Sequence, residues 1–230
     1  MVTAGGVAVT LALAGCSGDD APDPRGATYT TAMLQAGVLE PADIGTAWKR
    51  PAQTPPTTSV TPLCPGVAKR PPVPGSPTGA VAASMADEGE KGAQAFDQLG
   101  LVYKDAAAME AAFTSLQDAM EACPPSASRS AAPRDDTSEA GYTETAAIDP
   151  LESGGWKGFV TVRHKVYEPT YPGSADVAVA VVGQGNAIVV ASYAVYWVGS
   201  HSAGPEFDAD WRRVVGTVLS RVDAKRPSQR

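Results

Sequence analysis

Residues with reactive side chains are scarce in this sequence, which contains two histidines and three cysteines among 230 residues. This scarcity leaves no paired-histidine or Cys-x-x-Cys motif for a zinc site. The Gly-x-Ser-x-Gly motif of α/β-hydrolases, a phosphate-binding loop, a His-Glu-x-x-His motif and a calcium-binding loop are also absent from the sequence. We therefore predict that the protein is not an enzyme and uses no metal or cofactor.

Basic residues are also in short supply, with 18 Lys and Arg against 25 Asp and Glu and a net charge of −7. Because binding to phosphates needs a basic face, we expect no nucleic-acid partner. No apolar run approaches the ~20 residues of a membrane-spanning helix. The length and the 43% hydrophobic content suit one domain with a sizeable core.

The N-terminal segment carries the most specific signal in the sequence. A short apolar run ends in Leu13-Ala14-Gly15-Cys16, and polar, acidic residues follow at once. The run is too short to span a bilayer and is typical of a signal peptide. Leu13-Ala14-Gly15-Cys16 resembles the lipobox of bacterial lipoproteins. That resemblance implies a signal peptide over residues 1–15 and lipidation of Cys16. The acylated cysteine would then anchor the protein in lipid at the outer face of the bacterial plasma membrane.

This segment departs from most signal peptides in one respect, since no Lys or Arg precedes the apolar run. One explanation is that Met1 is an internal residue and the true start lies upstream. The other is an apolar N-terminus with a chance cysteine. In the lipoprotein interpretation, the polar residues 16–27 form a flexible tether between the anchor and the domain.

With Cys16 assigned to lipidation, Cys64 and Cys123 remain as an even pair in an oxidising compartment. Such a pair predicts a disulfide. Two separate buried thiols or a metal site are the alternatives.

Hydrophobic periodicity predicts one α+β domain over residues 28–224. Apolar spacings of three and four predict a short helix near 33–38 and amphipathic helices over 105–123 and 205–222. Alternating or β-branched runs predict strands over 94–103, 156–167, 176–182 and 187–198. The turn Gly183-Gln184-Gly185-Asn186 joins the last two strands into an antiparallel hairpin. This order predicts one twisted antiparallel sheet with helices packed on one face.

Three segments lack such periodicity. Residues 51–80 are dense in proline and are expected to form a long surface excursion, which a disulfide at Cys64 would pin to the domain. Residues 124–140 are expected to form a mobile loop, and residues 225–230 a frayed tail.

One strand suggests a binding surface. Along residues 156–167, valines occupy one face while Arg163, Lys165 and Tyr167 occupy the other. If helices cover the valine face, the second face would be open, with aromatic and cationic side chains able to bind an anionic or polar ligand. The candidate groove consists of Trp156, Arg163, Lys165, Tyr167, Tyr196 and Trp197. The alternative is that these aromatics are ordinary strand formers and the charges a solvated face.

The two histidines have structural interpretations. His164 shares the apolar register of its strand, so we expect an inward or sheet-edge side chain whose hydrogen bonds are satisfied. His201 lies in a polar turn and is expected to be a surface residue.

Short motifs add a family resemblance. Leu39-x-x-Ala42-Asp43-x-Gly45-x-x-Trp48, Cys64-Pro65 and the helix that ends at Cys123-Pro124 resemble the extracytoplasmic sensor domains of PknH-like receptor Ser/Thr kinases. The resemblance implies an antiparallel sheet with helices around a cleft, and ligand sensing. Two disulfides are typical of that sensor, whereas this chain can form only one.

These observations predict a membrane-anchored extracytoplasmic lipoprotein with a non-catalytic, sensor-like domain that binds an unknown small ligand or envelope protein. The alternative is a structural lipoprotein that docks another membrane protein.

Overall fold

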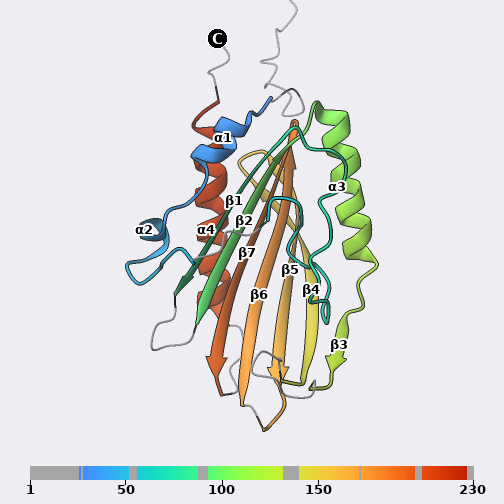
Figure 1. Cartoon of the computed structure of the whole chain (residues 1–230), viewed down its shortest axis with the longest axis vertical. Coiled ribbons are helices and arrows are strands. Elements are labelled where there is room, and N and C mark those ends of the chain that lie inside the picture. The colour runs from blue at the N-terminus through green and yellow to red at the C-terminus, as the bar shows by residue number, and fades with distance from the viewer. Residues whose placement is uncertain are drawn as a thin grey trace, which may run out of the picture.

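A computed structural model describes residue 26 and residues 28–51, 56–87, 93–131, 140–170, 172–199 and 204–226. Its strands form one seven-stranded antiparallel sheet in the order β1-β2-β7-β6-β5-β4-β3 (Figure 1). The helices are α1 (Thr31–Ala36), α2 (Pro41–Ile44), α3 (Ala106–Glu121) and α4 (Pro205–Asp223). The strands are β1 (Gly79–Asp87), β2 (Gln94–Val102), β3 (Ser126–Arg129), β4 (Tyr142–Ser153), β5 (Trp156–Tyr167), β6 (Gly173–Gln184) and β7 (Ala187–Val198). The predicted α+β class is confirmed.

The predicted long helices and the final hairpin are confirmed. The Asp105 carboxylate accepts a hydrogen bond from the N–H of Ala108 at 2.8 Å and so caps α3. Helix α4 begins with Pro205 and has Glu206 and Asp208 in its first turn. Their negative charges interact favourably with the positive end of the helix dipole. Strands β6 and β7 pair in register across the predicted turn, in which Gly185 has a φ of 58°.

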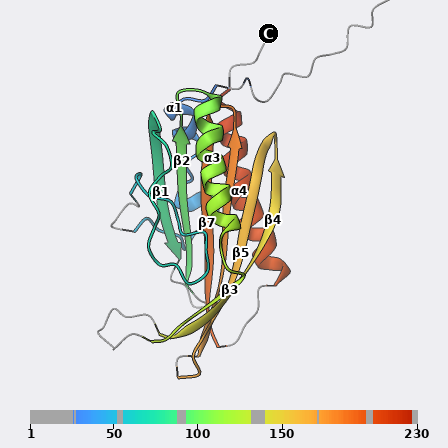
Figure 2. The same cartoon turned by 90° about the vertical axis from the view of Figure 1, so that its right-hand side faces the viewer.

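Helices cover both faces of the sheet, so the prediction of helices on one face is wrong. Figure 2 shows α3 on the near side of the central strands and α4 behind them. The reason lies in β6, where the valines at 177, 179 and 181 belong to the core under α3. The residues between them, Ala178, Ala180 and Val182, belong to the core under α4. A strand that is apolar on both faces must be covered on both faces. We call these the α3 face and the α4 face.

The proline-rich segment is part of the cover on the α3 face. Val60 and Leu63 are 0% and 4% exposed and belong to the same core cluster as α3. The predicted disulfide is confirmed, since Cys64 and Cys123 are bonded across a sequence separation of 59. Arg70 forms an ion pair with Asp97 on β2. This segment is therefore fixed against the sheet at several points along its length.

Two strands lie where irregular structure was predicted. Strand β1 starts at Gly79, inside the predicted excursion, and β3 occupies part of the predicted 124–140 loop. Strand β3 has the sequence Ser-Ala-Ser-Arg and is mostly exposed, so no apolar alternation announces it. It forms because its backbone pairs with Tyr142–Thr145 of β4. Residues 132–139 of the predicted loop and 227–230 of the predicted tail lie outside the described residues.

The chain enters and leaves the domain at the β6–β7 hairpin end. The Asn186 side chain accepts a hydrogen bond from the Tyr29 N–H at 2.6 Å and donates to the Tyr29 and Tyr103 carbonyls. The Tyr29 hydroxyl donates to Asp223 at 2.8 Å, near the end of α4. Burial, together with the hydrogen bond to Asp223, raises the pKa of the Tyr29 hydroxyl. Tyr29, which directly precedes α1, is therefore tied to the last turn of α4.

The α4 face also holds Trp48 and is tied to the short helix α2. Trp48 is 7% exposed and stacks on Tyr193 with ring centroids 6.2 Å apart. Asp43 of α2 forms a two-pronged ion pair with Arg221 of α4 at 2.6 and 2.7 Å. Within the part of the chain that the structure describes, no helix is both long and apolar enough to cross a membrane.

Candidate functional site

The six predicted groove residues do not share one surface. Trp156 is fully buried in the α4-face core, and its indole N–H donates to Asp223 at 3.2 Å. Trp197 packs on the same face and donates to Asp176 at 3.2 Å. The two tryptophans therefore lie on the opposite side of the sheet from the cationic residues.

The four other residues share the α3 face. Lys165, Ala175 and Tyr196 form one row across three strands, because each is the register partner of the next. Arg163 and Tyr167 flank Lys165 two residues away along β5 and point to the same side. The structure thus brings together the cationic and tyrosine members of the predicted set.

Arg163 is covered, so the expectation of an open second face is wrong at this position. Its side chain is 9% exposed and pairs with Glu144 at 3.4 Å, and the Glu144 side chain is 2% exposed. Arg163 also donates to the Cys64 carbonyl at 3.3 Å, and the Gly66 N–H donates to Glu144 at 2.7 Å. The buried pair is thus the point at which the proline-rich segment attaches to the sheet. Arg163 cannot meet a ligand without displacing this segment.

An aromatic–cationic cluster lies beyond the cover, toward the ends of the strands. The Lys165 ammonium lies 4.0 Å from the centroid of the Tyr142 ring and 5.8 Å from that of Tyr167. The two rings meet edge to face with centroids 6.0 Å apart. The attraction between the ammonium charge and the faces of the rings stabilises this position of the Lys165 side chain. Tyr142 was not predicted as a member of the groove. It lies two residues from Glu144 along β4, so the two side chains share this face.

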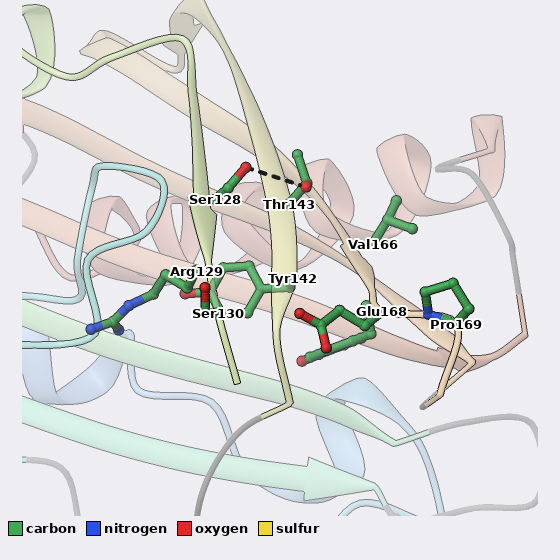
Figure 3. Close-up of a pocket in the computed structure, with 9 residues that line it drawn as sticks. Ser128, Arg129, Ser130, Tyr142, Thr143, Val166, Glu168 and Pro169 are labelled. Carbon is green, nitrogen blue, oxygen red and sulfur yellow. Dashed lines mark hydrogen bonds between the residues drawn. The ribbon is translucent and has the colours of Figure 1, made fainter. Parts of the chain in front are cut away.

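A cavity of about 350 Å³ adjoins this cluster. It lies at the end of the sheet where β3 and β5 finish and β4 begins, and Figure 3 shows its lining. Its principal side chains are Ser128, Arg129, Tyr142, Thr143, Tyr167 and Glu168. We call it the β3–β5 pocket. Tyr167 is the one member of the predicted groove that lines it.

The pocket combines hydroxyl, aromatic and charged groups. The Ser128 and Thr143 hydroxyl oxygens are 3.3 Å apart across the β3–β4 pair, as the dashed line in Figure 3 marks. Arg129 and Glu168 bring opposite charges from β3 and from the end of β5. Within the described residues Arg129 takes part in no ion pair, so its guanidinium is available to a ligand. Sequence reasoning missed Ser128 and Arg129 because it did not predict β3.

His164 forms a separate polar cluster on the α4 face. Its Nδ1 lies 2.7 Å from a carboxylate oxygen of Asp176, and the other oxygen accepts from Trp197. Asp176 is fully buried, so His164 and Trp197 together satisfy a carboxyl group that water does not reach. Among the described residues no hydroxyl or thiol lies within hydrogen-bonding distance of His164. The predicted satisfied histidine is confirmed, whereas His201 lies outside the described residues.

In the described part of the chain, no group of three His, Cys, Asp or Glu side chains is placed to hold a metal ion. The pocket residues are instead suited to hydrogen bonding, stacking and charge pairing.

Comparisons with known proteins connect the fold to a solved structure. No family model and no curated protein matches the sequence. The crystal structure of the extracellular domain of PknH from Mycobacterium tuberculosis is similar, with a TM-score of 0.56 and 12% sequence identity. The match covers 87% of this chain and 100% of that domain. At this identity the likeness shows a shared fold, as the short motifs predicted.

Proposed function

We propose that this chain is a lipid-anchored extracytoplasmic protein whose domain binds a small polar ligand in the β3–β5 pocket without catalysing a reaction. The observation that carries the proposal is a pocket at the sheet end that Arg129, Tyr142 and Tyr167 line from one face and the Ser128 and Thr143 hydroxyl groups line from the other. A few polar groups beside an aromatic wall are typical of small-ligand sites. The fold shared with a kinase's extracellular domain is consistent with a sensor-like role.

An extracytoplasmic location is supported by the Cys64–Cys123 disulfide, because disulfides persist mainly in oxidising compartments. The lipobox-like Leu13-Ala14-Gly15-Cys16 supports anchoring through Cys16. A lipoprotein carries more than one acyl chain, and two chains hold a protein stably on a membrane where one does not.

The fold suits such an anchor. Helix α1 lies at one end of the sheet and β3 at the opposite end (Figure 1). Tyr29, just before α1, is bonded to Asn186 of the β6–β7 hairpin, whereas the pocket is lined by the end of β3. Strand β5 links the two ends with 12 residues, which span about 40 Å at ~3.3 Å per residue. With the tether attached near Tyr29, the pocket would face away from the membrane and toward diffusible ligands.

Anchoring is tested by mass spectrometry of the N-terminal peptide from the full chain expressed in a bacterium. We expect a mature N-terminus at Cys16 that carries acyl groups, and release of a Cys16→Ala variant from the membrane fraction. An unmodified N-terminus that includes residues 1–15 would refute the lipoprotein assignment.

Ligand binding is tested by a thermal-shift screen of residues 17–230 against polar metabolites and envelope fragments. A ligand at about 100 times its dissociation constant adds roughly 2.7 kcal/mol, which raises the melting temperature by several degrees. The shift should disappear in an Arg129→Ala, Tyr167→Ala variant. It should persist in Lys157→Ala, a matched control at the other end of β5. A shift that survives the double variant would place the ligand elsewhere.

A further inference from the structure

Two buried polar atoms on the α3 face have no hydrogen-bond partner within the described residues. They are the Thr161 hydroxyl oxygen and the Nε of Arg163. Thr161 is 0% exposed and Arg163 is 8% exposed, so neither atom is solvated from the surface. Nearly all buried polar groups in folded proteins are hydrogen-bonded, because an unpaired group loses its hydrogen bonds to water without replacement. These two atoms therefore point to a bound partner.

The two atoms belong to neighbouring side chains on one face of one strand. Thr161 and Arg163 are two residues apart on β5, so both side chains point to the α3 face, with Cα atoms about 6.6 Å apart. Their register partners on the adjacent strands β4 and β6 all have apolar side chains: Ala146, Ile148, Val177 and Val179. The side chains beside Thr161 and Arg163 on the sheet therefore cannot satisfy them.

The charge of Arg163 is already neutralised, and this limits what the partner can be. Its Nη1 pairs with Glu144 at 3.4 Å and donates to the Cys64 carbonyl at 3.3 Å. The nearby Lys165 holds its ammonium over the Tyr142 ring. An anion at Nε would therefore place a second negative charge beside a guanidinium that Glu144 already neutralises. A metal ion does not fit, because the Nε–H of arginine is only a donor. The partner is therefore a small neutral molecule that accepts a hydrogen bond.

We propose that one buried water molecule bridges the Thr161 hydroxyl and the Arg163 Nε beneath the proline-rich segment. At ~2.8 Å per hydrogen bond, one water joins atoms up to about 5.6 Å apart, which suits side chains spaced as these are. The Cys64 carbonyl accepts one N–H from Arg163 and has a second lone pair, so it offers the water a third partner. The water thus completes the attachment of the proline-rich segment to β5. It is distinct from the β3–β5 pocket, and neither proposal depends on the other.

A crystal structure of residues 17–230, which include every described residue, tests the proposal directly if its resolution shows ordered water. We expect a water peak within about 3.2 Å of both the Thr161 Oγ1 and the Arg163 Nε. The peak should be lost from crystals of the Thr161→Val variant. Two outcomes would overturn the proposal. One is a rotation of both side chains that pairs them with protein groups, and the other is a density too large for water.

Urea unfolding gives a second readout, because the bridging water reverses the sign of one substitution. Without the water, Thr161→Val would remove an unsatisfied buried hydroxyl and raise the urea midpoint. With the water, the same change breaks a hydrogen bond and leaves the Arg163 Nε poorly satisfied, so we expect the midpoint to fall by about 0.5 M.

The matched control is Thr145→Val, which makes the same replacement at an exposed position of β4. Its midpoint should stay within about 0.3 M of that of the native protein, as is usual for surface substitutions. A Thr161→Val midpoint that is unchanged or higher would refute the bridging water.

Discussion

The buried ion pair between Glu144 and Arg163 makes the sharpest stability prediction. Both side chains are less than a tenth exposed, and Glu144 also accepts the Gly66 N–H. The variant Glu144→Gln keeps the side-chain shape and an acceptor for Gly66 but removes the negative charge. Arg163 then remains buried with a charge that no carboxylate neutralises. Breaking a buried pair in this way costs about 3–5 kcal/mol, because the remaining charge stays desolvated.

The measurement is urea unfolding of the oxidised protein, followed by tryptophan fluorescence. A domain of this size has a stability of about 5–15 kcal/mol, so a loss of ~3 kcal/mol moves the midpoint by about 1–2 M. The double variant Glu144→Gln, Arg163→Met removes both charges. It should recover most of the loss, since apolar replacements of buried pairs are often neutral or stabilising.

A second readout connects the pair to the proline-rich segment. Because Arg163 and Glu144 hold the backbone of Cys64 and Gly66, the single variant should expose residues 56–73 to limited proteolysis while the sheet stays folded. Glu144→Gln within 1 kcal/mol of the native protein, with unchanged proteolysis, would refute the role of the pair as the attachment point.

Three further outcomes follow from the same core. Replacement of Cys64 and Cys123 by Ala should cost about 4 kcal/mol in urea unfolding, from the loop entropy of a 59-residue separation, and a smaller loss would indicate residual structure in the unfolded chain. Asn186→Ala leaves the buried Tyr29 N–H and the Tyr29 and Tyr103 carbonyls without their hydrogen-bond partner, so it should lower the free energy of unfolding by roughly 3 kcal/mol in thermal unfolding. A change below about 1 kcal/mol would indicate instead that water replaces the amide. Burial raises the pKa of Tyr103 and of Tyr193 to about 12, so the folded state holds protons that the unfolded state has released. Stability should be complete below pH 10 and fall as the pH rises toward 12, and flat urea midpoints over pH 9–12 would contradict this assignment.

The elements that sequence reasoning predicted are those with a strong local signal. The α4 stripe of Phe207, Trp211 and Val218 repeats at helical spacing and is buried. The Gly185-Asn186 turn forces the β6–β7 hairpin. The long runs of β6 and β7 hold a further signal in the sequence. Both strands are apolar at consecutive positions, which indicates burial on both faces and therefore two layers of cover.

The candidate site was predicted only in part, for two reasons. Trp156 and Val160 are four residues apart on β5, so their side chains point to the same face of the sheet. Arg163 is an odd number of residues from both and therefore points to the opposite face. That misplacement could have been avoided. Ser128 and Arg129 could not be found in this way, because β3 is specified by its pairing with β4, and its own four residues show no apolar alternation. The β-propensity of these four residues does not reveal a contact with a strand so far along the chain.

The proline-rich cover explains how the α3 face is completed without another helix. A segment dense in proline has few conformations to lose on folding, so fixing it against the sheet costs little entropy. Val60 and Leu63 supply the apolar contact, and the Cys64 bridge and the Glu144–Arg163 pair fix its position. None of the described residues of this cover lines the β3–β5 pocket. A ligand can therefore enter the pocket while the cover stays closed, so reduction of the disulfide should lower stability without abolishing ligand binding in the fraction that remains folded.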